Sequence, residues 1–568
     1  MKKQNKIIIY QVFPRWFGNL KADPVKNGSI NDNGVGKFSF FTDEVLQRIE
    51  ALGVTHVWYT GIIEHATCTD YSQWRIRRDH DAIVKGKAGS PYAIKDYYDV
   101  DPDLAENVPD RMQEFEAMVE RTHNNGLQVI IDFVPNHVAR QYYSDSRPPY
   151  IEDLGHHDNT SVAFDSNNNF YYIPGQPLTF VQDNQQADFI YSEFPAKATG
   201  NDHFDAFPSH NDWYETVKLN YGIDYLNAHT AHFNPIPDTW KKMLDILLFW
   251  CSKGVDGFRC DMAEMVPVEF WHWAIPQVKE VHDTMFIAEI YNPSEYSAYL
   301  ERGCFDYLYD KVGLYDTLRK VVRNELPASN ISYCWQSMGD MQRQALTFME
   351  NHDEQRIASD FFAGNAQAGF PAMIVAASMN INPVMIYSGQ EVGERGMDEE
   401  GYSGRDGRTS IFDYWSLSSI RGWINEGKFD GGGLTEAQRL LREDYSKLLN
   451  ACILEPVIRE GGFYDLTYAN LNNPNFNPAR EYVFLRKLDK TILLVLVNFD
   501  SSEHDVQIHI PDEAFRALAI KDNEPAHVKD LLFGDEVIGT LTSSCPYRLT
   551  VPAFSGKMLR FTFDIREI

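Results

Sequence analysis

Alternating strand-like and helix-like segments, one long polar interruption and a strand-only ending together predict an α/β protein of three parts. The expected fold is a (β/α)8 TIM barrel with an inserted B subdomain after its third strand and a C-terminal antiparallel β-sandwich. The expected boundaries are 1–134 and 238–454 for the barrel, 135–237 for the insertion and 455–568 for the sandwich. A chain of 568 residues is long enough for about three or four such units.

Eight short apolar runs, rich in β-branched and aromatic residues, are the expected barrel strands. Helix-like stretches separate them, which favours a parallel (β/α)8 barrel over an open doubly wound sheet. The predicted strands are 6–12, 56–60, 127–134, 255–260, 285–290, 305–309, 345–350 and 384–387. The clearest helices are expected at 42–52, 109–125, 238–252 and 268–281.

The third strand is followed by about a hundred residues rich in Asn, Asp, His and Tyr. A structureless loop of that size is improbable in a compact domain, so we expect an inserted subdomain. Near the end of the barrel, Thr435 is a candidate N-cap for a helix that continues to about residue 450. Six short strands then follow without long helices, which predicts the sandwich. They are expected at 463–471, 481–487, 491–499, 506–510, 547–551 and 557–563.

Charge and cysteine content exclude several partners. The 81 acidic and 52 basic residues give a net charge of −29 at pH 7, which argues against nucleic acid and anionic membranes. No segment reaches the ~18 apolar residues of a membrane helix, and the first residues lack a signal-peptide pattern. Seven scattered cysteines without a CxxC pair indicate reduced thiols in a cytoplasmic protein. A secreted chain whose leader had been removed would look the same, and no motif indicates an oligomeric state.

Charged and polar residues gather at the carboxyl ends of four predicted strands, where active sites of such barrels are built. One acid there is weak evidence, because solvated and capping carboxylates are common, but several in one ordered set are informative. The set is Asp132, Asn136 and His137 after the third strand, Arg259 and Asp261 at the fourth, Glu289 at the fifth, and His352 and Asp353 at the seventh.

Glycosidic bond cleavage requires such a set. Its oxocarbenium-like transition state needs one carboxylic acid to protonate the leaving oxygen and a carboxylate on the other face of the sugar ring. Arg259 and Asp261 are two residues apart on a strand, so their side chains leave it on the same side. The guanidinium is therefore expected to keep Asp261 ionised, as a nucleophile requires.

The segments DFVPNH, GFRCD, IAEI and ENHD resemble, in order and spacing, the four signature segments of the α-amylase family of glycoside hydrolases. The resemblance covers essentially the whole chain, including IYQVFPRWFGN at the start and YSGQEVG after the eighth predicted strand. It implies a retaining mechanism in which Asp261 is the nucleophile, Glu289 the general acid/base and Asp353 the transition-state stabiliser. It also implies that Arg259, His137, His352 and Tyr92 line the −1 sugar site.

A fifth family segment reads VKLN in the insertion, and its lysine bears on calcium. Calcium-dependent amylases have an aspartate ligand where this chain has Lys218, whose ammonium can occupy the space of the ion. We therefore expect no required cofactor. Calcium is disfavoured by Lys218, and Asn136 would be a ligand if the ion were present. Met265 stands where calcium amylases use a backbone carbonyl as a ligand. Because every residue has such a carbonyl, Met265 gives no evidence for or against calcium.

Lys218 and the sequence FRCDMAEMVPVEFW resemble the neopullulanase and cyclomaltodextrinase branch of the family. That branch has an extra N-terminal domain, whereas this sequence begins at the first predicted barrel strand, so no such domain is expected. Glu264 stands where the family shapes its +1 and +2 sites, and we expect it to contact substrate.

The expected activity is hydrolysis of α-1,4-glucosidic bonds in starch-derived glucans or maltooligosaccharides. A transglycosidase or trehalose-forming isomerase would use the same three acids, and α-1,6 cleavage is an option within the neopullulanase-like branch. A non-catalytic relative, such as a transporter-associated subunit or a glycan-binding protein, is disfavoured because all three acids are present and no membrane helix is predicted.

Overall fold

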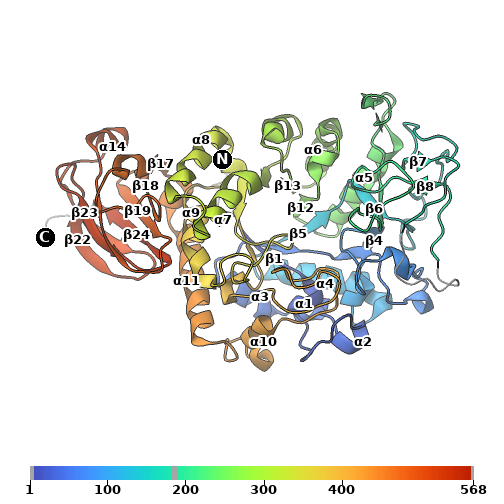
Figure 1. Ribbon diagram of the computed structural model, residues 1–568, viewed down its shortest axis with the longest axis horizontal. Helices are drawn as coiled ribbons and strands as arrows, with labels where there is room; N and C mark the ends of the chain where they lie inside the picture. The colour runs from blue at the N-terminus through green and yellow to red at the C-terminus, as the bar shows by residue number, and fades with distance from the viewer. Residues whose placement is uncertain (1–5, 181–189, 564–568) are drawn as a thin grey trace.

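A computed structural model describes residues 6–180 and 190–563. Within them, eight parallel strands form a closed barrel in the spatial order β1-β16-β15-β14-β13-β12-β5-β2 (Figure 1). Parallel pairing of β1 with both β16 and β2 closes the ring. The eight strands were all predicted. They are β1 (Ile8–Val12), β2 (His56–Tyr59), β5 (Gln128–Phe133), β12 (Gly257–Cys260), β13 (Met285–Ala288), β14 (Tyr307–Tyr309), β15 (Ala345–Phe348) and β16 (Val384–Tyr387).

Helices surround the barrel, each turning its apolar face inward. The longest, α11, starts at a capping box in which Thr435 and Gln438 bind each other's backbone N–H groups. Two helices have the predicted bounds, α5 and α6. The main covering helices are α3 (Asp43–Glu50), α4 (Arg111–Asn124), α5 (Asp238–Ser252), α6 (Val268–Val281), α7 (Asp316–Val322), α8 (Ile331–Met338), α9 (Phe370–Ser378), α10 (Ser418–Ile424) and α11 (Glu436–Leu454).

Large apolar side chains fill the inside of the barrel, so it is a packed core and not a pore. Nearly every strand contributes at least one. They include Ile9, Trp58, Ile130, Ile287, Tyr309, Leu346, Phe348 and Met385. The polar residues at the carboxyl ends of the strands lie above this packed interior and form the floor of the cleft.

The polar stretch between β5 and α5 forms the inserted domain B, which lies at the end of the molecule opposite the C-terminal sheets (Figure 1). Its described residues pair into small antiparallel sheets. These are β6 (His137–Ala139) with β9 (Thr216–Lys218), β7 (Tyr172–Ile173) with β8 (Ala196–Lys197), and β10 (Ile223–Asp224) with β11 (Thr230–Ala231). The β6–β9 pair joins the exit from the barrel to the return segment and so fixes domain B beside the cleft.

A hairpin that was not predicted follows β2. Its strands, β3 (Ile63–His65) and β4 (Ile94–Val100), pair in antiparallel fashion with register shifts. The first strand has three residues and a long excursion separates it from the second, so local sequence gives little signal for the pair. The excursion returns at Tyr92, just before β4.

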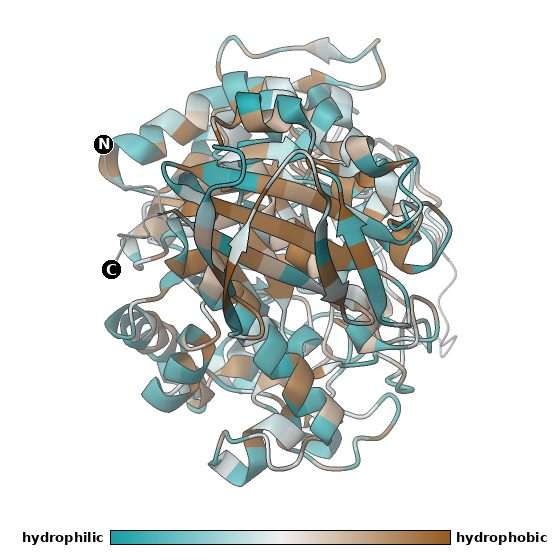
Figure 2. Ribbon diagram, turned by 90° about the vertical axis from the view of Figure 1, so that its left-hand side faces the viewer, coloured by the Kyte–Doolittle hydropathy of each residue, from teal (hydrophilic) through white to brown (hydrophobic). Residues whose placement is uncertain are grey.

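The C-terminal domain consists of a six-stranded antiparallel sheet, β17-β18-β19-β24-β21-β22, and a two-stranded sheet, β20-β23. Alternate residues of β18 (Glu481–Leu488) and β19 (Thr491–Asn498) contact the barrel helices or the second sheet. Burial of both faces explains why β19 reads as a continuous apolar run. Figure 2 shows this sheet with its hydrophobic strands. The other strands are β17 (Gly462–Asp465), β20 (His504–Ile508), β21 (Pro525–Asp530), β22 (Glu536–Thr540), β23 (Tyr547–Val551) and β24 (Ser555–Thr562).

Two expectations for this domain were wrong. The strand expected at 463–471 ends early, because the Asp465 carboxylate accepts the Thr467 N–H and starts the short helix α13 (Thr467–Asn470). Strands β21 and β22 were missed: β21 begins at a proline and exposes alternate residues, and β22 is a largely exposed edge strand.

Among the described residues, no helix combines the length and apolar character needed to cross a bilayer.

Candidate active site

Arg259 lies at the centre of the cleft at the carboxyl ends of the barrel strands. Its side chain is fully buried, with Nη1 2.6 Å from Asp261 Oδ1 and Nη2 2.6 Å from Glu289 Oε1. Nη1 is also 3.5 Å from Oδ1 of Asp132, which is paired with Arg259 across β5 and β12. One guanidinium therefore faces three carboxyl groups.

Aromatic rings enclose this guanidinium. The Arg259 Cζ atom lies 5.4 Å from the ring centroid of Trp58 and 5.5 Å from those of Tyr92 and Tyr309. Trp58 also donates from Nε1 to Asp132 Oδ2 at 3.0 Å. The rings exclude water and so strengthen the electrostatic interactions between Arg259 and the acids. Trp58 and Tyr309 were not predicted as site residues, because from sequence they read as ordinary barrel core.

The expected effect of Arg259 on Asp261 is only partly correct. Burial raises the pKa of Asp261 well above its ordinary value, Arg259 opposes this shift, and the neighbouring Glu289 carboxylate adds to it. The ion pair therefore forms as predicted, and Arg259 lowers the pKa of Asp261 against the effect of burial.

Glu289 has two further hydrogen-bond donors. The Met262 N–H donates to Oε2 at 2.7 Å, and the Tyr291 hydroxyl donates to Oε1 at 2.7 Å. Met262 adopts a left-handed backbone with φ +43°, which is unfavourable for a residue with a long side chain. That conformation, directly after Asp261, turns the Met262 N–H toward Glu289.

His352 and Tyr92 connect the third acid to the barrel floor. The two rings stack with centroids 5.2 Å apart, and the Tyr92 hydroxyl is 2.6 Å from His352 Nε2. The same nitrogen lies 3.1 Å from Asp353 Oδ2, and Gln11 Nε2 lies 2.8 Å from Nδ1. Burial would raise the pKa of Asp353, but His352, Arg259 and Arg408 together outweigh it and lower that pKa to about 2. Asp353, whose side chain is 45% exposed, therefore presents an ionised carboxylate to the cleft.

His137 lines the wall formed by domain B. Burial, together with the ammonium groups of Lys218 and Lys85, lowers its pKa to about 3, so the ring is neutral at ordinary pH. The Trp213 ring lies 5.2 Å from it. Trp213 also lines the cleft.

The carboxylate of Glu264 binds backbone N–H groups of the loop that follows Glu289. Its two carboxylate oxygens accept the N–H groups of Tyr291 and Asn292, each at 3.1 Å. Glu264 therefore positions the loop after Glu289, and any effect on substrate is expected to act through Tyr291. Sequence reasoning missed Tyr291, although its position two residues after Glu289 places both side chains on the same side of an extended segment.

Replacing Tyr291 by phenylalanine is expected to lower kcat/KM by up to about 10-fold, the usual effect of losing one neutral hydrogen bond. Because the hydroxyl contacts the residue expected to protonate the leaving group, the loss should grow as the leaving group becomes a poorer one. Kinetics on aryl α-glucosides of graded leaving-group pKa measure this. An equal loss on all of them would show that Tyr291 contributes only to binding.

Lys218 lies between the barrel and domain B and is buried. Its Nζ is 2.5 Å from Asn136 Oδ1, 2.6 Å from Asp202 Oδ1 and 3.4 Å from the Met265 carbonyl oxygen. The ammonium thus contacts the same amide and carbonyl groups that were considered as calcium ligands. These residues do not fit a calcium ion as they stand, because the cation position is filled by a side chain of the protein.

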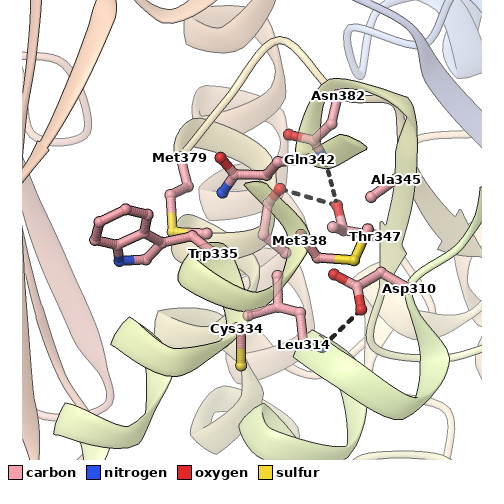
Figure 3. A pocket seen from close by; sticks show the side chains of 11 residues that line it. Asp310, Leu314, Cys334, Trp335, Met338, Gln342, Ala345, Thr347, Met379 and Asn382 are labelled. Carbon is pink, nitrogen blue, oxygen red and sulfur yellow. Dashed lines mark hydrogen bonds between the residues drawn. The ribbon is translucent and has the colours of Figure 1, made fainter. Parts of the chain in front are cut away.

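A cavity of about 340 Å³ lies over the acids. Its lining residues come from the barrel, the segment between β3 and β4, domain B and the segment after β16. They are Lys85, Ser90, Tyr92, His137, Trp213, Glu215, Thr216, Asp261, Met262, Glu289, Tyr291, Asp353, Ile411 and Phe412. A separate hollow of about 10 Å³, which includes Asp310, Cys334 and Asn382, has room for roughly one water (Figure 3). It shares no residue with the cleft.

Two other clusters of potential metal ligands occur in the described residues. Glu152, His156 and His157 are exposed, and Glu152 pairs with His157 at 2.8 Å. The second cluster, Glu64, Asp96 and Asp99, is buried. Neither cluster lines the cleft.

Comparisons with known proteins are consistent with this geometry. Residues 11–413 match the family model for the α-amylase catalytic domain. Alpha-amylase MalA of Haloarcula japonica is 23% identical over 402 residues, which are 69% of this chain and 45% of that protein. Neopullulanase 2 of Thermoactinomyces vulgaris is 20% identical over 405 residues, 68% of this chain and 57% of that protein. The chain thus spans about half the length of these curated relatives.

Solved structures show the same fold. The crystal structure of the maltogenic α-amylase AmyB from Thermotoga neapolitana aligns with a TM-score of 0.62 at 21% identity. The alignment covers 98% of this chain and 99% of that one, so the C-terminal sheets are included with the barrel.

Proposed function

The chain belongs to the α-amylase family of glycoside hydrolases, and on that premise we propose that it cleaves α-1,4-glucosidic bonds of starch-derived glucans or maltooligosaccharides with retention. The observation that carries the proposal is the bridging of Asp261 and Glu289 by one buried guanidinium. A shared guanidinium keeps two carboxyl groups close together. That supports the separation of about 5–5.5 Å used by retaining enzymes over the wider spacing that inverting enzymes need for a water.

In the proposed reaction, an Asp261 oxygen attacks the anomeric carbon while Glu289 gives a proton to the glycosidic oxygen. The C–O bond to the leaving sugar breaks, and a covalent glycosyl-enzyme forms on Asp261. Glu289, now ionised, takes a proton from water, which attacks the same carbon and releases the product.

The surrounding groups stabilise positive charge on the sugar ring. Asp353 has a lowered pKa and offers a carboxylate on the cleft side. Tyr92 provides a ring face beside the acids, and neutral His137 can hydrogen-bond a sugar hydroxyl without adding positive charge near the oxocarbenium-like centre. No step in this mechanism requires a metal ion.

Incubation with maltotriose, followed by NMR of the products, tests the proposal. Glucose and maltose should appear, with the new reducing end first present as the α-anomer and converting later to the β-anomer. Initial β-anomer would contradict retention. Longer oligomers or trehalose would indicate transglycosylation or isomerisation, and cleavage of pullulan without maltotriose would indicate α-1,6 specificity.

We also propose a cytoplasmic location. All seven cysteines are free thiols and four of them are buried, which suits a reducing compartment. Measuring activity with and without a thiol reductant tests the requirement for reduced cysteines. Full activity only under oxidising conditions would contradict it.

A further inference from the structure

One end of the cleft is closed where three segments meet at Lys85. Its Nζ lies 2.8 Å from Glu215 Oε1 in domain B. The same atom lies 5.7 Å from the ring centroid of Tyr214 and 5.9 Å from that of Phe412, in the segment after β16. Lys85 itself belongs to the excursion between β3 and β4, so a single side chain joins all three walls.

The backbone behind Lys85 leaves no gap between two of these walls. The Ala88 N–H donates to the Phe412 carbonyl at 3.1 Å. Arg15 Nη1 donates to the carbonyls of Gly89 and Ile411 at 3.0 and 2.6 Å. A Cβ on Gly86, which has φ +68°, would lie 2.1 Å from the Phe412 carbonyl oxygen, so only glycine allows this approach.

Glu215 has hydrogen-bonding capacity that the protein leaves unused. The residue is 4% exposed, and its Oε2 has no hydrogen-bond partner among the described residues. Both Glu215 and Lys85 line the cavity over the acids. A buried carboxylate oxygen without a partner is costly, which points to a ligand that donates to it.

The neighbours of the pair assign it to the glycosyl side of the cavity and not to the side of the leaving group. The leaving group belongs beside Glu289 and Tyr291, because Glu289 donates the proton to it. Glu215, in contrast, directly precedes Thr216 of β9, which pairs with Ala139 of β6, the strand that begins at His137. His137 belongs to the wall expected to line the −1 sugar, so Lys85 and Glu215 border the glycosyl unit that is transferred to Asp261.

We propose that Lys85 and Glu215 bind neighbouring hydroxyls at the non-reducing end of the substrate, and that the wall they form makes the enzyme act on chain ends. Sugar hydroxyls can accept from the ammonium and donate to the free carboxylate oxygen in the same diol. The proposal rests on the function proposed above. It adds which end of the glucan the enzyme attacks and which residues bind that end.

The position of the first cleavage tests whether the enzyme attacks from the non-reducing end of the chain. With maltoheptaose labelled at its reducing end, we expect unlabelled glucose as the first small product, with the label retained on the longer fragment. Labelled fragments of many lengths from the start would show internal cleavage and would overturn the end-acting proposal while leaving the hydrolase assignment intact. Absence of any cleavage of any α-glucan would overturn both.

Variants test the two residues. Lys85→Met and the nearly isosteric Glu215→Gln are each expected to lower kcat/KM on maltotriose by about 10- to 100-fold, as for a lost charge-assisted hydrogen bond. The matched control is Lys87→Met, two residues away and exposed, which should retain wild-type kinetics. A purely structural ion pair would lower thermal stability without changing KM or the product pattern. Wild-type kcat/KM in folded Glu215→Gln would overturn the assignment.

Discussion

Replacing Asp261 by asparagine is expected to lower kcat by at least about 10⁴-fold, the scale seen when an attacking group of a hydrolase is removed. The amide keeps the size and hydrogen-bonding shape of the side chain but cannot form the glycosyl ester. The fold should be unaffected, because Arg259 still faces Glu289 and Asp132 and is not left unpaired. Removing one of three buried acids also relieves repulsion.

Two measurements check this prediction. Steady-state rates on maltotriose give the loss of turnover, and the apparent melting temperature should stay within about 3 °C of the wild type. Cys260→Ala is a matched control, because Cys260 is the neighbouring residue on β12 and its buried side chain packs into the core behind the cleft. Near-normal activity of Asp261→Asn would contradict the nucleophile assignment.

The second large effect is expected at Lys218. We predict that the wild-type enzyme keeps its activity and melting temperature in a calcium chelator, because the ammonium already holds Asn136 and Asp202 together. Lys218→Met should destabilise the contact between domain B and the barrel by about 2–3 kcal/mol. This is less than for a fully buried pair, since Asp202 is 36% exposed.

Lys218→Asp distinguishes the two ways of filling this position. It places a third oxygen-bearing side chain beside Asn136 and Asp202, so added calcium should raise the melting temperature of this variant and not that of Lys218→Met. Differential scanning fluorimetry with chelator and with calcium measures both. Loss of wild-type activity in chelator would contradict the view that Lys218 replaces a metal.

The barrel could be predicted from sequence because its strands are short apolar runs and helix-like segments separate them. The same logic failed for β22, an exposed edge strand, and for the β3–β4 hairpin, whose strands are joined by a long excursion. In these places the pairing depends on contacts between distant segments, which no local pattern records.

The acids of the site were predictable because they lie at or shortly after the carboxyl ends of barrel strands, which converge on one face. Lys85 and Glu215 could not be predicted as site residues. They lie on irregular segments from different parts of the chain, and only the folded structure brings these segments together beside Phe412. The electrostatics also required the structure. From sequence, Asp261 was the one acid expected to contact Arg259, whereas in the fold the guanidinium faces three acids. Burial also raises the pKa of Asp261, which the sequence did not indicate.

Trapping the covalent intermediate is the most direct test of the central claim that Asp261 is the nucleophile of a retaining enzyme. A fluorinated α-glucosyl fluoride that glycosylates the enzyme quickly and hydrolyses slowly would be added, followed by proteolysis and peptide mass spectrometry. We predict one glycosyl adduct on the peptide that contains Asp261, and none in Asp261→Asn. An adduct on Glu289 or Asp353, or turnover of natural substrate without any adduct, would contradict it.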